Sequence, residues 1–228
     1  MNLSKLETFL GVKFKNKNLL KEAITHRSYL NENSKLSPVH NERLEYLGDA
    51  VLELCVTEAL YKKYPDYQEG PLTSIRAALV NYQMLGKIAR EIELEEHILL
   101  SRGEAKDVGK AREVILANAF EALVGALYLD QGYNVVSDFI KKFLLTHLEE
   151  IMTAGLYRDA KSLLQEIIQE KNKITPTYRV LKESGPDHFK KFLVGVFVGK
   201  ELLAEGDGTS KQEAESHAAE LALAELKK

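Results

Sequence analysis

Cysteine is nearly absent from the sequence: Cys55 is the single one, and it lies in the apolar run VLELCV. One thiol cannot build a disulfide framework, and its apolar surroundings are typical of a small core residue, so we expect a reducing, cytoplasmic compartment. No set of cysteines and histidines has zinc-binding spacing, and no glycine-rich phosphate loop follows a predicted strand. These absences exclude a disulfide-stapled domain, a zinc module and a P-loop nucleotide-binding protein.

Long apolar runs and a basic excess are also lacking. No segment approaches membrane-spanning length, and the N-terminus, MNLSKLETFLGVKFKNKNLL, has no continuous apolar core or small-residue cleavage site of a signal peptide. We therefore expect no membrane partner. The 31 Lys and Arg residues face 34 Asp and Glu, a net charge of −3. A role on nucleic acid would have to rest on local basic patches.

The 228 residues follow two patterns in succession. Up to about residue 153, apolar residues recur every three or four positions, which predicts helices over 6–12, 18–24, 42–64, 71–92, 112–132 and 135–152, with Pro71 as a first helical residue. From residue 159 we predict one helix, three strands rich in Val, Phe and Gly, and a last helix. The predicted domains are 1–153 and 159–228, joined by a linker at 154–158.

Two local signals sharpen the second pattern. Gly199-Lys200 separates two apolar runs and predicts a two-residue hairpin turn with glycine first. Ser210 and Glu213 have the spacing of a capping box, which predicts the start of the last helix.

An acidic stripe marks the predicted helix over 42–64. Glu42, Glu45 and Asp49 are three and four residues apart, so they share one side of the helix, where like charges repel by about 0.2–0.5 kcal/mol per pair. The opposite stripe is apolar and consists of Leu44, Leu47, Val51 and Leu54. Two interpretations are open: a solvated acidic face, or a group of metal ligands.

A second segment bears on this choice. Residues 115–129, ILANAFEALVGALYL, are apolar almost all round and should be buried, yet they contain Asn118 and Glu121 one turn apart. A buried, unpaired carboxylate costs several kcal/mol or takes up a proton, so Glu121 needs a cation. That cation is either an Arg or Lys or a metal ion. If the two helices meet, their oxygen-bearing side chains suit Mg²⁺.

Several sequence motifs resemble those of a known family. The segment HNERLEYLGDAVL (40–52) resembles the signature of the ribonuclease III family, and THRSY (25–29), EGPLTSIRAALVN (69–81) and ILANAFEALVGALYLDQG (115–132) resemble its other blocks in the same order. The segment from residue 159 onward resembles a double-stranded-RNA-binding domain. The resemblance implies a multi-domain fold, with an all-α nuclease domain followed by an α+β domain of order α-β-β-β-α.

The resemblance also assigns roles in the nuclease domain. It implies that Glu45, Asn118 and Glu121 are metal ligands and that Asp49 and Glu121 are catalytic, with Mg²⁺ as the cofactor and Mn²⁺ as a substitute. Asn118 departs from the family, where its position is often an aspartate, and brings one negative charge fewer. Glu42 matches a signature position of more structural weight and is left outside the core site.

Three elements of the second domain are expected to contact RNA. Duplex RNA is read through its shape, its 2′-hydroxyls and its phosphates. The resemblance implies that Gln165 and Glu166 reach one minor groove, that the loop with Pro186 and His188 enters the next, and that Lys211 meets phosphate. Few lysines surround Lys211, so we expect a shallow salt dependence of binding.

The leading hypothesis is an endoribonuclease that cleaves double-stranded RNA as a homodimer. The resemblance implies products with 5′-phosphate and 3′-hydroxyl ends and short 3′ overhangs, and work on ribosomal, messenger and transfer RNA precursors. Arg76 either binds a phosphate or neutralises a carboxylate. Two rivals stay open: a non-cleaving double-stranded-RNA-binding regulator, suggested by Asn118, and a helical scaffold with a solvated acidic stripe.

Overall fold

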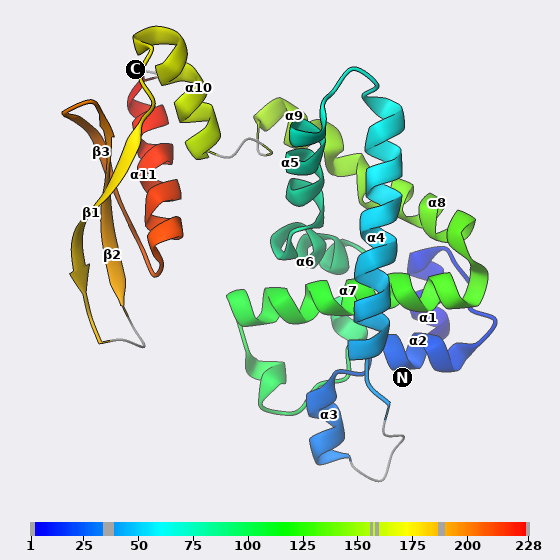
Figure 1. Ribbon diagram of the computed structural model, residues 1–228. Coiled ribbons are helices and arrows are strands. Elements are labelled where there is room, and N and C mark those ends of the chain that lie inside the picture. Colours follow the sequence, from blue (N-terminus) through cyan, green and yellow to red (C-terminus); the bar gives the residue numbers. More distant parts are fainter. Residues whose placement is uncertain (1–2, 34–38, 156, 158–159, 187–189, 227–228) are drawn as a thin grey trace. The chain divides into compact units, whose positions relative to one another are not determined.

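The computed structural model describes residues 3–155, except 34–38, together with 157, 160–186 and 190–226 (Figure 1). The chain divides into two compact units, Met1–Tyr157 and Arg158–Lys228. The predicted linker at 154–158 includes residues 156 and 158, which lie outside the described residues, so its bounds stay a prediction. Among the described residues, none of the helices combines the length and apolarity of a membrane span.

The first unit is built of helices, as its three- and four-residue periodicity predicts. A short parallel bridge joins Thr25 to Leu99. The α-helices are α1 (Leu3–Leu10), α2 (Lys17–Ala23), α3 (Arg27–Glu32), α4 (Glu42–Lys63), α5 (Glu69–Val80), α6 (Tyr82–Glu91), α7 (Lys110–Gln131), α8 (Tyr133–Phe143) and α9 (Leu148–Ala154). Short 3₁₀ turns are η1 (Leu94–His97), η2 (Glu104–Lys106) and η3 (Leu145–His147).

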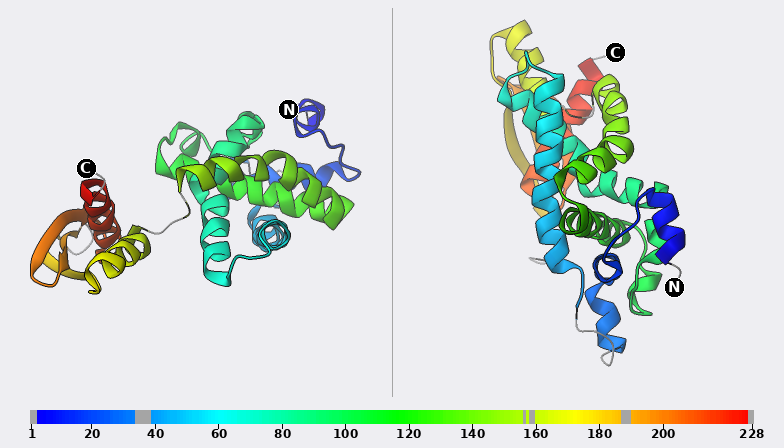
Figure 2. Two further views of the ribbon diagram at one scale, coloured as in Figure 1. Left: turned by 90° about the horizontal axis from the view of Figure 1, so that it is seen from above. Right: turned by 90° about the vertical axis from the view of Figure 1, so that its right-hand side faces the viewer.

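The crossing of α4 and α7 forms the centre of this unit, and the two views agree that these helices pack directly on one another (Figures 1 and 2). Most of α7 is buried from Ile115 to Leu127, as its all-round apolar sequence predicts. A Cβ atom built on Gly48 would overlap the backbone carbonyl of Glu121, and one built on Gly125 would overlap the carbonyl of Leu44. Each helix therefore has a glycine at the contact, and only a residue without a side chain fits there.

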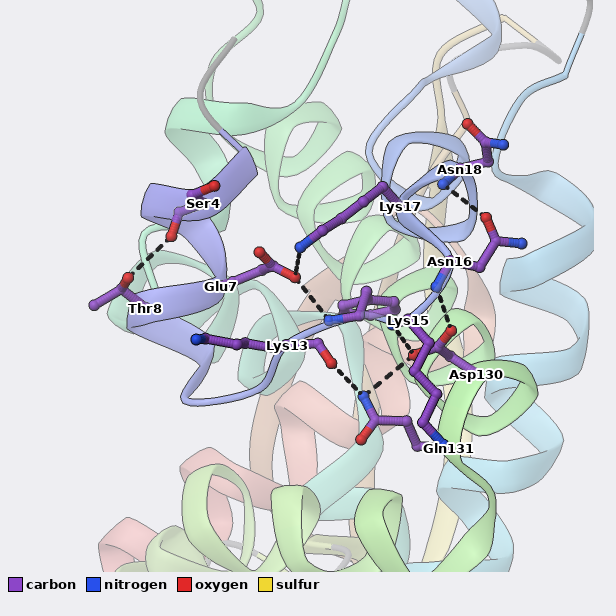
Figure 3. Close-up of polar contacts among 11 residues, drawn as sticks. Ser4, Glu7, Thr8, Lys13, Lys15, Asn16, Lys17, Asn18, Asp130 and Gln131 are labelled. Carbon is purple, nitrogen blue, oxygen red and sulfur yellow. Dashed lines mark hydrogen bonds and ion pairs between the residues drawn. The ribbon is translucent and has the colours of Figure 1, made fainter.

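Polar contacts fasten the N-terminal segment to the end of α7 (Figure 3). The carboxylate of Asp130 accepts hydrogen bonds from the backbone N–H groups of Lys15 and Asn16, each at 2.8 Å. The buried carboxylate of Glu7 accepts one from the N–H of Phe14 at 2.7 Å. These bonds satisfy loop N–H groups that have no partner in a helix, and so they fix the α1–α2 loop against the α7 core.

Helix boundaries differ from the sequence prediction in several places. The predicted helix over 135–152 is α8 and α9, separated by the 3₁₀ turn η3. Two further differences concern α5 and α6. Helix α5 begins at Glu69, so Pro71 is its third residue and not its first. Proline is tolerated there because the N–H groups of a first helical turn have no intrahelical acceptor. The predicted helix over 71–92 is two helices, because Asn81 adopts an extended backbone and its side chain accepts a hydrogen bond from Met84 N–H, which caps α6.

The second unit has the predicted order of helix, three strands and helix: α10 (Ala160–Asn172), β1 (Thr177–Ser184), β2 (Lys191–Val198), β3 (Glu201–Gly208) and α11 (Lys211–Leu226). The strands form one antiparallel sheet in the order β1-β2-β3, and Gly199 takes φ 62° in the turn between β2 and β3. The hairpin prediction is confirmed. A separate core, which includes Leu164, Val196 and Ala218, joins both helices to the sheet.

At the start of α11, one of the two hydrogen bonds of the predicted capping box is present. The Ser210 hydroxyl accepts a hydrogen bond from Glu213 N–H at 3.1 Å, as predicted. The Glu213 carboxylate, however, accepts its bond from Thr209 N–H at 2.7 Å and not from Ser210 N–H. The reciprocal bond therefore lies one residue earlier, and Glu213 still satisfies a backbone donor that precedes the helix.

Replacement of Gly48 by alanine tests the helix crossing. The added methyl group overlaps a backbone carbonyl, so α4 and α7 must separate, and we expect a loss of about 1–3 kcal/mol in the free energy of unfolding. Urea unfolding followed by circular dichroism measures it. The matched control is Gly70→Ala in α5, where a Cβ meets nothing within 4 Å and alanine favours the helix. Equal effects of the two substitutions would contradict the close contact.

Candidate active site

The crossing of α4 and α7 brings the predicted acids into one electrostatic group. Asp49 directly follows Gly48, and the backbone carbonyl that Gly48 packs on belongs to Glu121. Glu45 precedes Asp49 by one turn of α4 and lies on the same side. The same glycine contact that joins the helices therefore places Glu121 of α7 beside the acidic stripe of α4.

The ionisation of Glu121 shows how closely these groups interact. Burial raises the pKa of Glu121 to about 8, and the negative charges of Asp49 and Glu45 add to the shift. Burial also raises the pKa of Glu45, with further contributions from the charges of Glu42 and Asp49. The charges that act on Glu121 are thus negative, which disfavours the interpretation that an Arg or Lys neutralises it.

The remaining predicted residues of this site lie where the sequence periodicity puts them. Asn118 is half-buried on α7, one turn before Glu121, and Asp49 is exposed on α4. Glu42 is exposed and its carboxylate lies 3.6 Å from the Arg27 guanidinium. Its partner is therefore a surface arginine, although its charge also contributes to the raised pKa of Glu45.

The donor chemistry of the site fits a divalent cation. Across the described residues, no three His, Cys, Asp or Glu side chains lie close enough together to hold a metal ion as they stand. Glu45, Asp49 and Glu121 nevertheless share one field of uncompensated negative charge, and Asn118 adds an amide oxygen to the set. Hard oxygen donors around unbalanced charge suit Mg²⁺, whose binding would relieve the repulsion.

Arg76 takes part in a different contact. Its guanidinium donates a hydrogen bond to the Thr57 hydroxyl at 3.0 Å and lies 4.0 Å from the Glu53 carboxylate. Glu53 is one turn beyond Asp49 on α4. Of the two interpretations left open by the sequence, the contact with a carboxylate is present, and that carboxylate lies outside the predicted metal-ligand set.

The predicted RNA-contacting residues of the second unit occupy exposed positions. Gln165 and Glu166 lie on the surface of α10, and Pro186 is exposed after β1. His188 lies outside the described residues. Lys211 opens α11, and its ammonium group lies 3.4 Å from the Glu183 carboxylate and 5.7 Å from the centre of the Phe192 ring.

Comparisons with known proteins match both units. A family model described as Ribonuclease-III-like matches residues 16–148, and the double-stranded RNA binding motif matches residues 160–226. "Ribonuclease 3" of Borreliella afzelii is 46% identical over 221 residues, which cover 97% of this chain and 90% of that protein. "Ribonuclease 3" of Nitratiruptor is 44% identical over 225 residues, covering 99% of this chain and 97% of that protein.

The chain belongs to the ribonuclease III family. It is an endoribonuclease of double-stranded RNA, with a helical nuclease domain followed by an RNA-binding domain. A solved nuclease domain of ribonuclease III from Campylobacter jejuni, whose title concerns flexibility in a region involved in dimer formation, is 41% identical. It has a TM-score of 0.58 and covers 64% of this chain and 97% of its own length.

The buried side of α4 differs from the apolar stripe that the sequence predicts. Leu54, predicted on the inward stripe of α4, is 57% exposed. Leu52 and Val56, two residues to either side of it, are buried and lie on nearly the opposite side of the helix, so the core meets another side of α4 than the one with Leu54. The periodicity also gave no indication of a surface feature at Tyr46. Its side chain is 84% exposed and lies beside a groove of about 650 Å³ lined by Leu19, Leu47 and Leu129 among others.

Glu121→Gln is expected to stabilise the protein in EDTA at pH 8.5 and to have little effect at pH 5. The Glu121 pKa is about 8 in the folded chain against an ordinary value of 4.5, so its favourable contribution is complete below pH 4.5 and is lost as pH rises toward 8. An effect of about 1 kcal/mol raises Tm by about 2–4 °C. Thermal unfolding measures it.

The control for this pH series is Glu53→Gln, which removes the carboxylate one turn beyond Asp49 on α4. It should change Tm equally at both pH values. A Glu121→Gln protein that is less stable than the unmodified chain at pH 8.5 would contradict the crowding of charge at the site.

Proposed function

We propose that this ribonuclease III hydrolyses double-stranded RNA with Mg²⁺, or with Mn²⁺ as a substitute, and leaves 5′-phosphate and 3′-hydroxyl ends with short 3′ overhangs. The observation that supports the proposal is the contact of α4 with α7 at Gly48 and Glu121, where burial and the negative charges of Asp49 and Glu45 raise the pKa of Glu121. A cation that balances this negative charge would also have to lie next to the scissile phosphate, because it acts on the phosphoryl oxygens.

The residues divide the work between binding and proton transfer. Glu45, Asn118 and Glu121 hold the ion, and Asp49, the most exposed of the acids, accepts the proton of the attacking water and orients it. The bound ion supplies a water of lowered pKa and a Lewis acid for the phosphoryl oxygens. Glu121 must lose its proton before it can act as a ligand, so the affinity for Mg²⁺, and with it the activity at limiting Mg²⁺, should rise with pH toward about 8.

The substrates proposed are structured precursors of ribosomal RNA, with messenger and transfer RNA precursors as further targets, in the cytoplasm. The curated relatives named "Ribonuclease 3" over nearly the full chain support RNA as the substrate class. In the second domain, the exposed Gln165, Glu166 and Pro186 would meet the minor grooves and Lys211 a phosphate. Phosphate would have to compete with Glu183 for Lys211, which supports a shallow salt dependence.

We propose a homodimer, since one acid site can cut only one strand of a duplex. The Campylobacter jejuni nuclease domain has a region involved in dimer formation, and this chain carries an apolar surface that suits one. Tyr46 projects beside the 650 Å³ groove, and Leu129 at the groove is 55% exposed. In a two-fold pair, each Tyr46 can enter the groove of the other copy, because an isologous interface repeats every contact.

Tyr46→Ala should dissociate this dimer. Loss of a central aromatic anchor costs about 2–4 kcal/mol of association free energy, which moves the monomer–dimer equilibrium by about 30-fold or more. Sedimentation velocity over a range of protein concentrations measures the shift. Tyr61→Ala is the control, since Tyr61 is 72% exposed on the same helix but away from the groove. If Tyr46→Ala leaves the monomer–dimer equilibrium unchanged, the interface lies elsewhere.

The cleavage assay tests the proposal as a whole. Long, fully paired RNA with the purified chain and Mg²⁺ should yield short duplexes whose ends accept ligation as 5′-phosphates. Glu121→Gln should lower the rate by about 10²–10⁴-fold, because it removes a ligand that also takes part in turnover. Asn118→Asp should lower the Mg²⁺ concentration needed for half-maximal rate, because a carboxylate replaces an amide oxygen.

Glu53→Gln, one turn beyond Asp49 and outside the ligand set, is the control and should cleave normally. Products from Asn118→Asp but none from the unmodified chain would support the non-cleaving regulator. Full activity of Glu121→Gln would overturn the proposed site.

A further inference from the structure

A pocket of about 420 Å³ lies where the last turns of α4 meet the start of α5. Leu60, which is buried in the core, and Leu72 form part of its apolar lining. The volume is near the lower end of the range for small-molecule sites, about 300–1,000 Å³, and suits one planar ring system with its sugar. The acidic site and the dimer groove do not use this pocket.

Three tyrosines of this pocket offer aromatic faces to a ligand. Tyr61 is 72% exposed and Tyr67 is 40% exposed, and both line the same pocket, where grouped apolar side chains at the surface are typical of a binding site. The rings of Tyr64 and Tyr67 already stack, with centroids 4.9 Å apart and an angle of 26° between the planes. A further planar ring can extend this stack, since offset stacking is the favoured arrangement of aromatic groups.

Polar groups at one wall of the pocket fit a nucleotide. Arg76 carries a guanidinium there, which donates a hydrogen bond to the Thr57 hydroxyl and lies 4.0 Å from the Glu53 carboxylate, so a phosphate would have to compete with Glu53 for it. A guanidinium meets phosphate oxygens in a bidentate manner. Thr73 and Glu69 at the same pocket supply a hydroxyl and a carboxylate for the edge of a base. Aromatic faces beside a cation are the combination that binds single-stranded nucleic acid.

The pocket follows the acidic stripe along α4. Asp49, Glu53 and Thr57 are spaced four residues apart, so they run along one side of the helix. At 1.5 Å per residue, Thr57 lies about 12 Å along the axis from Asp49. An RNA strand at the acidic site therefore needs to extend only a short way to reach Arg76.

We propose that this pocket binds one unpaired nucleobase of the RNA substrate, stacked on the tyrosines with its phosphate at Arg76. The inference rests on the proposed function, because the base must belong to an RNA held at the acidic site. Fully paired RNA leaves the pocket empty and is still cleaved. The pocket then favours duplexes that carry a bulged or flanking unpaired nucleotide at this distance from the cleaved bond.

A fluorescent base tests the binding directly. The substrates are RNA hairpins with the same stem. One hairpin is fully paired, and each of the others carries a single unpaired 2-aminopurine at a different distance from the cleaved bond. In EDTA, which prevents turnover, the fluorescence of 2-aminopurine should fall on binding at one or two positions only, because stacking on tyrosine quenches it. The paired variants are Tyr61→Leu/Tyr67→Leu, which removes two rings, and Tyr61→Phe/Tyr67→Phe, which keeps them.

The double leucine variant should lose the quenching, and the double phenylalanine variant should retain it. With Mg²⁺, the unmodified chain should cleave the hairpin with the unpaired base about tenfold faster than the fully paired one at limiting substrate, and the leucine variant should cleave both equally. Cleavage of the paired hairpin should be unchanged in both variants, which separates this inference from the proposed function.

Three results would overturn the pocket assignment. One is quenching that persists in the leucine variant. Another is the absence of any position-dependent quenching in the unmodified chain while it cleaves paired RNA. The third is an equal loss of cleavage on both hairpins with the leucine variant, which would indicate that these tyrosines support the fold or bind another macromolecule.

Discussion

The close contact between Gly48 of α4 and Gly125 of α7 is the constraint on which the active site depends. Each glycine packs against a backbone carbonyl of the other helix, that of Glu121 or of Leu44. A side chain at either position would overlap that carbonyl and push the helices apart. The nuclease domain thus has a close backbone contact beside its group of like charges, and apolar burial along α7 opposes their repulsion.

Much of this arrangement could be predicted from the sequence, for identifiable reasons. Helical periodicity put Glu45 and Asp49 on one side of their helix, and the apolar surroundings of Glu121 indicated a buried carboxylate. Periodicity describes one helix at a time, so it could not show that Gly48 and Glu121 touch. It also predicted one continuous helix through Asn81, where a side-chain cap divides two helices, and it placed Leu54 on the buried side of α4, whereas the core meets the side with Leu52 and Val56.

Features that depend on the surface were the hardest to predict. In the sequence, Tyr46 looks like an ordinary residue of an amphipathic helix. Only the structure, which shows it exposed beside an apolar groove, indicates a contact with another molecule. The same holds for the RNA-binding domain. Lys211 matches an RNA-contacting position, yet its neighbour in space is Glu183, which comes from a strand 28 residues earlier and also lies 3.2 Å from Lys190. The lysines and the Glu183 carboxylate hold one another, and phosphate has to displace that carboxylate.

Asn118 can be understood from the same balance of charge that governs Glu121. Burial, together with the charges of Asp49 and Glu45, already raises the pKa of Glu121 to about 8. A fourth carboxylate at position 118, one turn from Glu121, would raise that pKa further, so more of the metal-free protein would carry a proton that a cation must displace. An amide removes this cost and keeps an oxygen donor. In the Mg²⁺ site that we propose, Asn118 would therefore give up part of the attraction for the ion in exchange for easier ionisation of Glu121 at neutral pH.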